Sequence, residues 1–338
     1  MEPVRIGILG AARIAALSIV APAAAMGHRL VAVAARDPGR ATAFAREHGV
    51  ERVHEGYADL LDDPEVEVVY NALPNALHGH WNARAAAAGK HVPGEKPSAA
   101  NGDEAARVQT AVDGAGVVFM EGFHYPYHPL FQRVCELVED GAVGAVRHVE
   151  PTLRMPPPPD ADPRWDLGLG GGATMDLGCY SLSCLRLLGR YAGGEPSVVG
   201  ARAEERPGRP GVDERLLVDI AYPSGATGSG GSDMADTRRD FHLSVRGTRG
   251  EILVPMFAVP HEDDTLVLRR SGEEVVEHLG TRSSYTYQLE VLARAVRLGD
   301  PVLTDAAWAR ATMELVDTAY RAAGMQPRTP APLASGRL

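Results

Sequence analysis

The chain has 338 residues, a formal net charge of −10 at pH 7, 45% hydrophobic residues and three cysteines. That length exceeds what one compact core needs and suits two domains. The negative charge, with no stripe of Lys and Arg, excludes a nucleic-acid-binding protein, and the lack of an apolar run of membrane length excludes a membrane protein. Because Cys135, Cys179 and Cys184 lack the spacing of metal ligands, we predict neither a metal site nor a disulfide framework and expect a cytoplasmic protein.

In the first part of the chain, short apolar stretches alternate with helical stretches. The strands are apolar on both faces and alternate with helices, which predicts an α/β fold with a doubly wound parallel sheet. We assign this fold to a domain at 1–122. Pro22 is expected to disturb the first helix. The predicted strands are 4–10, 29–35, 66–73, 90–95 and 116–121, and the first two helices are 11–26 and 38–48.

The pattern changes after Pro156–Pro159, a stiff connector. Strands follow one another directly from about 198 to 279, which predicts a mostly antiparallel sheet. Two helices, at about 287–298 and 305–323, close the chain. We therefore expect a second, α+β domain at 123–338.

The first chemical motif lies between the first strand and the first helix, as Gly10-x-Ala12-x-x-Ala15. A dinucleotide fingerprint belongs at this place, since Gly10 permits a tight turn and the helix offers N–H groups to a pyrophosphate. Alanine replaces glycine at two positions, and the methyl group of Ala12 would push the phosphates slightly away. An ordinary turn between a strand and a helix is the alternative.

The end of the second strand discriminates between cofactors. An acid there binds the ribose of NAD, whereas an arginine accommodates the 2′-phosphate of NADP. Arg36 precedes Asp37 at this point, and we predict that Arg36 binds the phosphate. The alternatives are a solvated arginine and an Asp37 that binds the ribose.

Lysine is scarce, since Lys90 and Lys96 are the two lysines among 34 basic residues. Arginine stays protonated, whereas a buried lysine can exchange a proton, so a retained lysine can mark chemistry. Lys96 follows the strand at 90–95, on the edge of a parallel sheet where ligands bind. We predict that Lys96 is catalytic, with a salt bridge to Glu95 as the alternative, and that Lys90 is a surface residue.

The stretch GGGATMDLGCYSL, Gly170–Leu182, combines dense glycine with an acid and a phenol. Glycine costs backbone entropy, so its density here needs a reason. On a regular helix, Asp176 and Tyr180 lie four residues apart on one face. The structural alternatives are a helix-capping Asp176 and a Tyr180 that only packs in the core.

Two further pairs of residues are weaker candidates. His78 and His80 lack a third ligand at helical spacing, so no metal is predicted, and His78 is either a pocket residue or a structural one. Arg164 and Trp165 precede the glycines and are expected to contact the substrate.

The segments GILGAARIA, LPNALH, AGKHVPGEKPSA and GGGATMDLGCY, in this order, resemble the Gfo/Idh/MocA family of NAD(P)-dependent oxidoreductases. The resemblance implies an N-terminal Rossmann domain, a C-terminal domain with a large open sheet, and a homodimer or homotetramer formed through that sheet. It also implies hydride transfer to or from a secondary alcohol or carbonyl of a sugar, sugar nucleotide or cyclic diol. The NADP-using dihydrodiol and D-xylose dehydrogenases and the nucleotide-sugar 3-ketoreductases are most similar, so NADP is expected rather than NAD.

The resemblance also assigns roles to residues. Tyr180 protonates the substrate oxygen alongside Lys96, Asp176 binds the substrate or orients Lys96, and the glycines let nicotinamide and substrate come close. A non-catalytic dinucleotide-binding regulator or scaffold of the same fold is the alternative function. The expected cofactor-binding residues are Gly10, Ala12, Arg13, Ile14, Arg36, Leu73, Pro74, Asn75, His78, Glu95 and Lys96, and the expected substrate-binding residues are Arg164, Trp165 and Tyr180.

Overall fold

The computed structural model describes residues 1–332, which form two compact units. The first unit contains Met1–Phe123, Tyr285–Met313 and the described residues from Thr329 onward, and the second contains His124–Ser284 and Glu314–Arg328. The first change of unit comes one residue after the predicted boundary at 122. The continuous second domain expected at 123–338 differs from these units, because two later segments pack with the first unit. The last six residues of that predicted domain, 333–338, lie outside the described residues.

The sheet of the first unit has six parallel strands in the order β3-β2-β1-β4-β5-β6. This is the strand order of a dinucleotide-binding Rossmann fold, and it confirms the predicted parallel sheet. The strands are β1 (Arg5–Leu9), β2 (Arg29–Ala34), β3 (Arg52–His54), β4 (Val68–Asn71), β5 (Val92–Gly94) and β6 (Phe119–Glu121).

The predicted helix at 38–48 is confirmed as α3, whereas the helix predicted at 11–26 begins at Arg13 and is divided into three segments. Asp37 and Asn101 cap α3 and α6 by accepting backbone N–H groups, and Gly49 and Gly116 end these helices in the left-handed conformation. Before Pro22, the first helix contains a π-helical turn, which confirms the expected disturbance. The segments are α1 (Arg13–Ala15), η1 (Ala16–Val20), α2 (Ala21–Met26), α3 (Pro38–His48), α4 (Tyr57–Asp62), α5 (Asn75–Ala87) and α6 (Gly102–Ala115).

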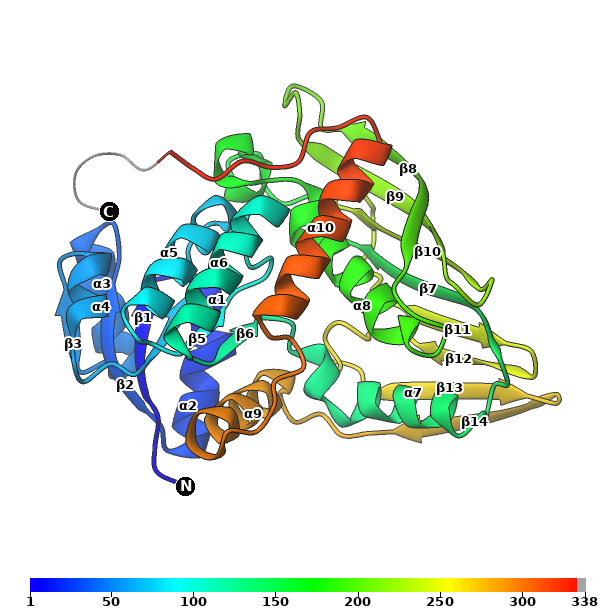
Figure 1. Cartoon of the computed structure of the whole chain (residues 1–338), viewed down its shortest axis with the longest axis horizontal. Helices are drawn as coiled ribbons and strands as arrows, with labels where there is room; N and C mark the ends of the chain where they lie inside the picture. Colours follow the sequence, from blue (N-terminus) through cyan, green and yellow to red (C-terminus); the bar gives the residue numbers. More distant parts are fainter. Residues whose placement is uncertain (333–338) are drawn as a thin grey trace. The chain divides into compact units, whose positions relative to one another are not determined.

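Late segments of the chain complete the first unit. Helix α5 lies beside α6 (Figure 1), and the core that they share with the sheet includes Trp81 and, from the start of α10 (Ala306–Ala322), Ala306 and Ala309. Helix α9 (Ser284–Leu298) is tied to the sheet because Arg297 forms an ion pair with Glu67. These long-range contacts explain why the unit is discontinuous in sequence.

The second unit is built on an eight-stranded sheet in the order β14-β13-β12-β11-β7-β10-β9-β8. Only β7 and β10 pair in parallel among these described strands, which confirms a mostly antiparallel sheet. Helices α7 (Pro129–Glu139) and α8 (Cys179–Gly189) pack on one face (Figure 1). The strands are β7 (Val146–Arg154), β8 (Ser197–Glu205), β9 (Asp213–Ala221), β10 (Thr227–Asp233), β11 (Leu243–Gly247), β12 (Gly250–Val254), β13 (Thr265–Arg270) and β14 (Glu273–His278).

Short helical turns precede α7 and α8 in the second unit: η2 (Tyr125–Tyr127), η3 (Pro163–Trp165), η4 (Leu167–Leu169) and η5 (Thr174–Gly178). No helix within residues 1–332 is long and apolar enough to cross a membrane.

Candidate active site

In the first unit, the turns that follow β1, β2, β4 and β5 lie at the carboxyl edge of the parallel sheet. Strands β1 and β4 are neighbours at the point where the strand order reverses, which is where ligands bind in such sheets. Gly10 adopts φ +94°, and a Cβ atom there would lie 3.1 Å from the carbonyl oxygen of Ala72. A bare backbone is therefore needed where the turns after β1 and β4 meet.

The predicted phosphate-binding turn has the expected form. Ala12 is extended directly before α1, and its N–H donates to the carbonyl of Gly10 at 2.9 Å. Arg13 is exposed and Ile14 is half-buried at the start of the helix. This end of the helix can present N–H groups to an anion, as the motif predicts.

Two arginines lie near this turn. Arg36 is exposed two residues after β2 ends. Asp37 is the alternative cofactor-binding residue at this position. It caps α3, since its carboxylate accepts a hydrogen bond of 3.1 Å from the N–H of Arg40, and so already has a structural role. The guanidinium of Arg40 donates to the carbonyl of Ala11 at 2.9 Å. Sequence reasoning missed Arg40, although its position one helical turn after Asp37 was available as a signal.

The segment after β4 differs from expectation at His78. Leu73 and Pro74 precede α5, which begins at Asn75. His78 is only 1% exposed, and its ring nitrogens lie 2.6 and 2.7 Å from the carbonyl oxygens of Leu73 and Pro97. Burial lowers the pKa of His78 to about 4. Both ring nitrogens thus lie against carbonyl oxygens of the protein, and the neutral ring can donate to one of them. His78 links two loops of the edge, which supports the structural alternative over the predicted pocket residue.

The Glu95-Lys96 pair follows β5. Glu95 is buried, and its Oε1 accepts a hydrogen bond of 2.5 Å from the hydroxyl of Tyr70, which also lies 2.5 Å from Ser18 Oγ. Burial raises the pKa of Tyr70, so this phenol keeps the proton that it donates. Lys96 is half-buried at the sheet edge. This placement agrees with the predicted position of Lys96 on the ligand side.

Lys90 differs from expectation. It is 9% exposed, and its ammonium donates to the carbonyl oxygens of Asp63 and Val66 at 2.8 and 2.7 Å. The prediction of a surface lysine is therefore wrong. Its role is to satisfy two carbonyl groups that precede β4.

In the second unit, the glycine run is explained by the protein's own groups. Gly172 has φ +128°, and a Cβ atom there would lie 2.1 Å from Asp213 Oδ1. A Cβ atom at Gly171 would lie 2.6 Å from the carbonyl oxygen of Arg164. The structure thus supplies a reason for the glycines other than the close approach of nicotinamide and substrate.

Asp213 is the centre of a buried network that fixes this turn. Its Oδ2 accepts from the N–H and the hydroxyl of Thr174 at 2.7 and 2.6 Å, and its Oδ1 accepts from Tyr320 at 3.0 Å. Arg328 forms an ion pair with the same carboxylate and donates to the carbonyl of Gly171 at 2.7 Å. Asp213 and Arg328 are 0% and 2% exposed, so both charges depend on these partners.

Asp176 lies just beyond this network and forms an ion pair with Arg164. Nη1 of Arg164 is 3.3 Å from Asp176 Oδ2, while Nε donates to Asp162 Oδ1 at 2.9 Å. The hydrogen bond from Arg164 to Asp162 raises the pKa of the guanidinium, with Asp176 adding to the effect. Two residues that were predicted separately, Asp176 and Arg164, are therefore brought together in a contact that the sequence did not indicate.

Trp165 does not fit its predicted role at the substrate. Its side chain is 1% exposed, the indole N–H donates to the carbonyl of Pro158 at 3.1 Å, and the guanidinium of Arg206 lies 4.5 Å from the ring centroid. Trp165 thus holds the proline-rich connector. A ring so completely covered by protein has no face left for a ligand.

Tyr180 lies near the start of α8 and is 9% exposed. Its hydroxyl is 3.5 Å from Nε2 of His124, a residue that the sequence analysis did not select. The preceding turn, Thr174–Gly178, is π-helical, so the regular helix expected across Asp176 and Tyr180 is interrupted. Turns of this kind often occur at functional sites.

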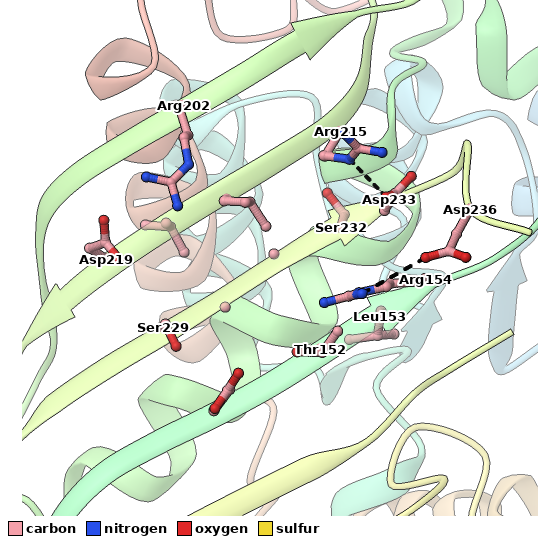
Figure 2. A pocket seen from close by; sticks show the side chains of 15 residues that line it. Thr152, Leu153, Arg154, Arg202, Arg215, Asp219, Ser229, Ser232, Asp233 and Asp236 are labelled. Atoms are coloured by element: carbon pink, nitrogen blue, oxygen red, sulfur yellow. Dashed lines mark hydrogen bonds and ion pairs between the residues drawn. The ribbon is translucent and has the colours of Figure 1, made fainter. Parts of the chain in front are cut away.

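A hollow of about 430 Å³ lies over β7, β8, β9 and β10 (Figure 2). Its lining is polar, with ion pairs Arg215–Asp233 at 2.7 Å and Arg154–Asp236 at 3.9 Å. None of the predicted catalytic or cofactor-binding residues lines it. The hollow is therefore separate from the candidate active-site residues.

The described residues thus carry two sets of groups suited to carbonyl chemistry: a half-buried ammonium at a Rossmann sheet edge, and a buried phenol beside a histidine. Lys96 belongs to the first unit, whereas Asp176 and Tyr180 belong to the second. Within residues 1–332, no group of three or more His, Cys, Asp or Glu side chains could hold a metal ion.

Comparison with known families gives two matches. Residues 4–123 match the model of the oxidoreductase family Gfo/Idh/MocA, NAD-binding Rossmann fold, and residues 131–253 match the model of the Gfo/Idh/MocA C-terminal domain.

Relatives match over most of the chain. The D-xylose 1-dehydrogenase (NADP(+)) 2 of Haloferax volcanii is 37% identical, over 94% of this chain and 96% of that protein. The dTDP-3,4-didehydro-2,6-dideoxy-alpha-D-glucose 3-reductase of Saccharopolyspora spinosa is 31% identical, over 89% and 90%. The crystal structure of a 3-ketoreductase from Actinomadura kijaniata, in complex with NADP and TDP-benzene, is similar with a TM-score of 0.87, 27% identity, and coverage of 95% of this chain and 98% of that one.

Proposed function

Because the chain belongs to the Gfo/Idh/MocA oxidoreductase family, we propose that it is an NADP(H)-dependent enzyme that transfers hydride to or from a secondary alcohol or carbonyl of a sugar, sugar nucleotide or cyclic diol. The observation that carries this proposal is the full-length similarity to sugar dehydrogenases and sugar-nucleotide reductases, in a chain that also places Lys96 at the ligand edge of its Rossmann sheet.

The first unit fits the cofactor. Gly10 leaves room that a side chain would fill, and the helix beginning at Arg13 follows directly. These features would hold the pyrophosphate, and the exposed Arg36 would bind the 2′-phosphate as a charge-assisted pair. The rest of the cofactor site at the carboxyl edge of the sheet would come from the turns after β4 and β5, which contain Leu73, Pro74, Asn75, Glu95 and Lys96. When bound, NADPH supplies the hydride.

Lys96 and Tyr180 supply the acid–base chemistry. Tyr180 donates a proton to the substrate oxygen as the alkoxide forms, and accepts it again in the reverse direction. The Lys96 ammonium polarises the substrate carbonyl. Asp176, held by Arg164 at 3.3 Å, accepts a hydrogen bond from a substrate hydroxyl.

The assembly and location of the enzyme are part of the proposal. The sheet face opposite α8 carries paired charges and the polar hollow of Figure 2, and we assign to it the contact of a homodimer or homotetramer. We also assign the enzyme to the cytoplasm, since its three cysteines form no disulfide in the described residues.

A direct assay tests the proposal. The purified chain is mixed with NADPH and a panel of keto-sugars, and with NADP and a panel of sugars and cyclic diols, while absorbance at the nicotinamide band is followed. Turnover with at least one member, and a preference for NADP(H) over NAD(H), is expected. Tight binding of the dinucleotide with no turnover across both panels would instead favour a dinucleotide-binding regulator of the same fold.

A further inference from the structure

A chain of hydrogen bonds in the second unit leads away from Tyr180. The Tyr180 hydroxyl lies 3.5 Å from His124 Nε2, and His124 Nδ1 lies 2.8 Å from Ser284 Oγ. The same Ser284 Oγ lies 2.8 Å from Nδ1 of His261. The first distance is at the outer limit of a hydrogen bond, as catalytic contacts without substrate often are.

The chain leads from the protein interior to a side chain in contact with solvent. His124 and Ser284 are 1% and 0% exposed, and Tyr180 is 9% exposed, whereas His261 is half-buried. The rings of His124 and Tyr180 also pack edge to face, with centroids 6.2 Å apart. Water therefore has access to one end of the chain, while its middle is enclosed.

The chemistry of Ser284 gives the chain a direction. A hydroxyl group has one proton to donate, so Ser284 can donate to at most one of the two Nδ1 atoms and has to accept from the other. When it accepts from His261 and donates to His124, the proton of neutral His124 is on Nε2, facing Tyr180. The position of one proton thus fixes the positions of the others along the chain.

We propose that Tyr180, His124, Ser284 and His261 form a proton relay that restores the proton of Tyr180 during carbonyl reduction. This inference rests on the proposed role of Tyr180. As hydride reaches the carbonyl carbon, the O–H bond of Tyr180 breaks and its proton bonds to the substrate oxygen. His124 Nε2 then gives its proton to the phenolate, Ser284 gives one to His124 Nδ1, and His261 Nδ1 gives one to Ser284.

The overall step is balanced by one hydride from NADPH and one proton from His261. Protonated His261 becomes neutral by losing its Nδ1 proton and keeps the proton on Nε2, and a proton from solvent returns to Nδ1 to restore the starting state. In alcohol oxidation each transfer runs backward, and neutral His261 receives the proton. His124, Ser284 and His261 act through Tyr180 and do not require contact with the substrate.

The surroundings of His261 set the pH range of the relay. Burial lowers its pKa, Arg239 lowers it further, and Glu262 raises it. Arg239 and Glu262 also pair with each other at 2.6 Å, and His128 is a further titratable neighbour. The pKa of His261 thus lies below its ordinary value of 6.5. Because reduction uses protonated His261, the rate of carbonyl reduction should fall as the pH rises through this pKa.

The first test is His261→Ala, assayed with the ketone that gives the fastest NADPH oxidation. A loss in kcat of at least about tenfold is expected on the acid side of the break in the wild-type pH profile, where His261 is protonated, and this loss is smaller than for a group that contacts the substrate. Added imidazole should restore much of this loss by replacing the missing proton carrier, and the break in the pH profile should disappear. NADPH affinity and the circular dichroism spectrum should stay as in the wild type.

The second variant is Ser284→Ala, which keeps both histidines and removes only the bridging hydroxyl. It should lower kcat to a similar extent. Imidazole should not restore the activity, because the missing hydroxyl lies inside the protein, where imidazole has no access. Ser244→Ala is the matched control, since Ser244 is a buried serine of the same unit that lies outside the relay and whose hydroxyl donates to Glu251 Oε1 at 2.9 Å. This control should keep wild-type kcat and pH dependence.

Two results would overturn the relay. One is wild-type kcat and pH profile in both His261→Ala and Ser284→Ala. The other is a lowered kcat with an unchanged pH profile and no response of His261→Ala to imidazole, which would indicate a structural role.

Tyr180→Phe separates the relay from the proposed function. If it keeps full turnover, the proposed role of Tyr180 fails and the relay with it. If it loses turnover while the relay variants do not, only the relay fails.

Discussion

The two units hold their candidate site residues by different means. In the first unit, Gly10, Arg36 and Lys96 each follow a strand of one parallel sheet, so the backbone topology places them at a common edge. In the second unit, the turn before Tyr180 is held by side chains far away in sequence. Asp213 lies 39 residues from Thr174, and Arg328 lies 157 residues from Gly171. Placement by topology tolerates changes of side chain, whereas placement by a buried network does not.

The largest expected effect comes from Lys96→Arg in the first unit. The variant keeps the positive charge but loses the compact ammonium and its transferable proton, so turnover should fall by about two to four orders of magnitude. NADPH binding and melting temperature should change little, because the fold at this edge is set by the strands. The measurement is steady-state NADPH oxidation beside a thermal melt.

The other lysine supplies the contrast. Lys90→Arg forces a larger group into a site that is 9% exposed, so it should lower stability by about 1–3 kcal/mol and spare turnover. Near-native turnover of Lys96→Arg would show that any positive charge suffices at this position, and that neither the compact ammonium nor a transferable proton is needed.

Asp213→Asn should give the largest stability effect in the second unit. It leaves the buried Arg328 without its counter-charge, and breaking such a pair costs about 3–5 kcal/mol. Urea denaturation measures this loss. Asp219→Asn, an exposed aspartate on the same strand β9, is the control and should unfold as the wild type does. Equal midpoints for the two variants would mean that the network does not hold the turn.

Arg36→Ala tests the topological placement of the cofactor site with a smaller effect. Loss of a charge-assisted contact to the 2′-phosphate should weaken NADPH binding by about tenfold or more and leave NADH binding almost unchanged. Arg46→Ala, an exposed arginine on α3, controls for the general loss of positive charge. Fluorescence titration measures all four affinities, and equal weakening of NADPH and NADH binding by Arg36→Ala would contradict the assignment.

The same contrast explains what the sequence could predict. Periodicity and strand ends predict the parallel sheet, the glycine turn at Gly10 and the edge position of Lys96, because these follow from local backbone rules. The burial of Lys90, His78 and Trp165 could not be predicted, since each is set by carbonyl groups or loops elsewhere in the fold.

Pairings between distant segments are equally hidden in the sequence. Tyr180 is 56 residues from His124, and His124 is 160 residues from Ser284. No local pattern reports such contacts, because each lone histidine or serine in the sequence is compatible with a surface position. The glycine run was visible, but its causes were not: Asp213 and Arg328 approach Gly172, and the carbonyl of Arg164 approaches Gly171.

Tyr180→Phe tests the central claim, that a phenol held by the second unit is the proton donor of a hydride-transfer enzyme. The ring and its packing are preserved, so the free energy of unfolding should change by no more than about 1 kcal/mol, the value of one hydrogen bond. Turnover with NADPH should fall by about a hundredfold or more, because the proton for the alkoxide has lost its donor. Both quantities are measured on the same purified variant. A lowered melting temperature with turnover almost unaltered would contradict the account and leave Tyr180 a structural residue.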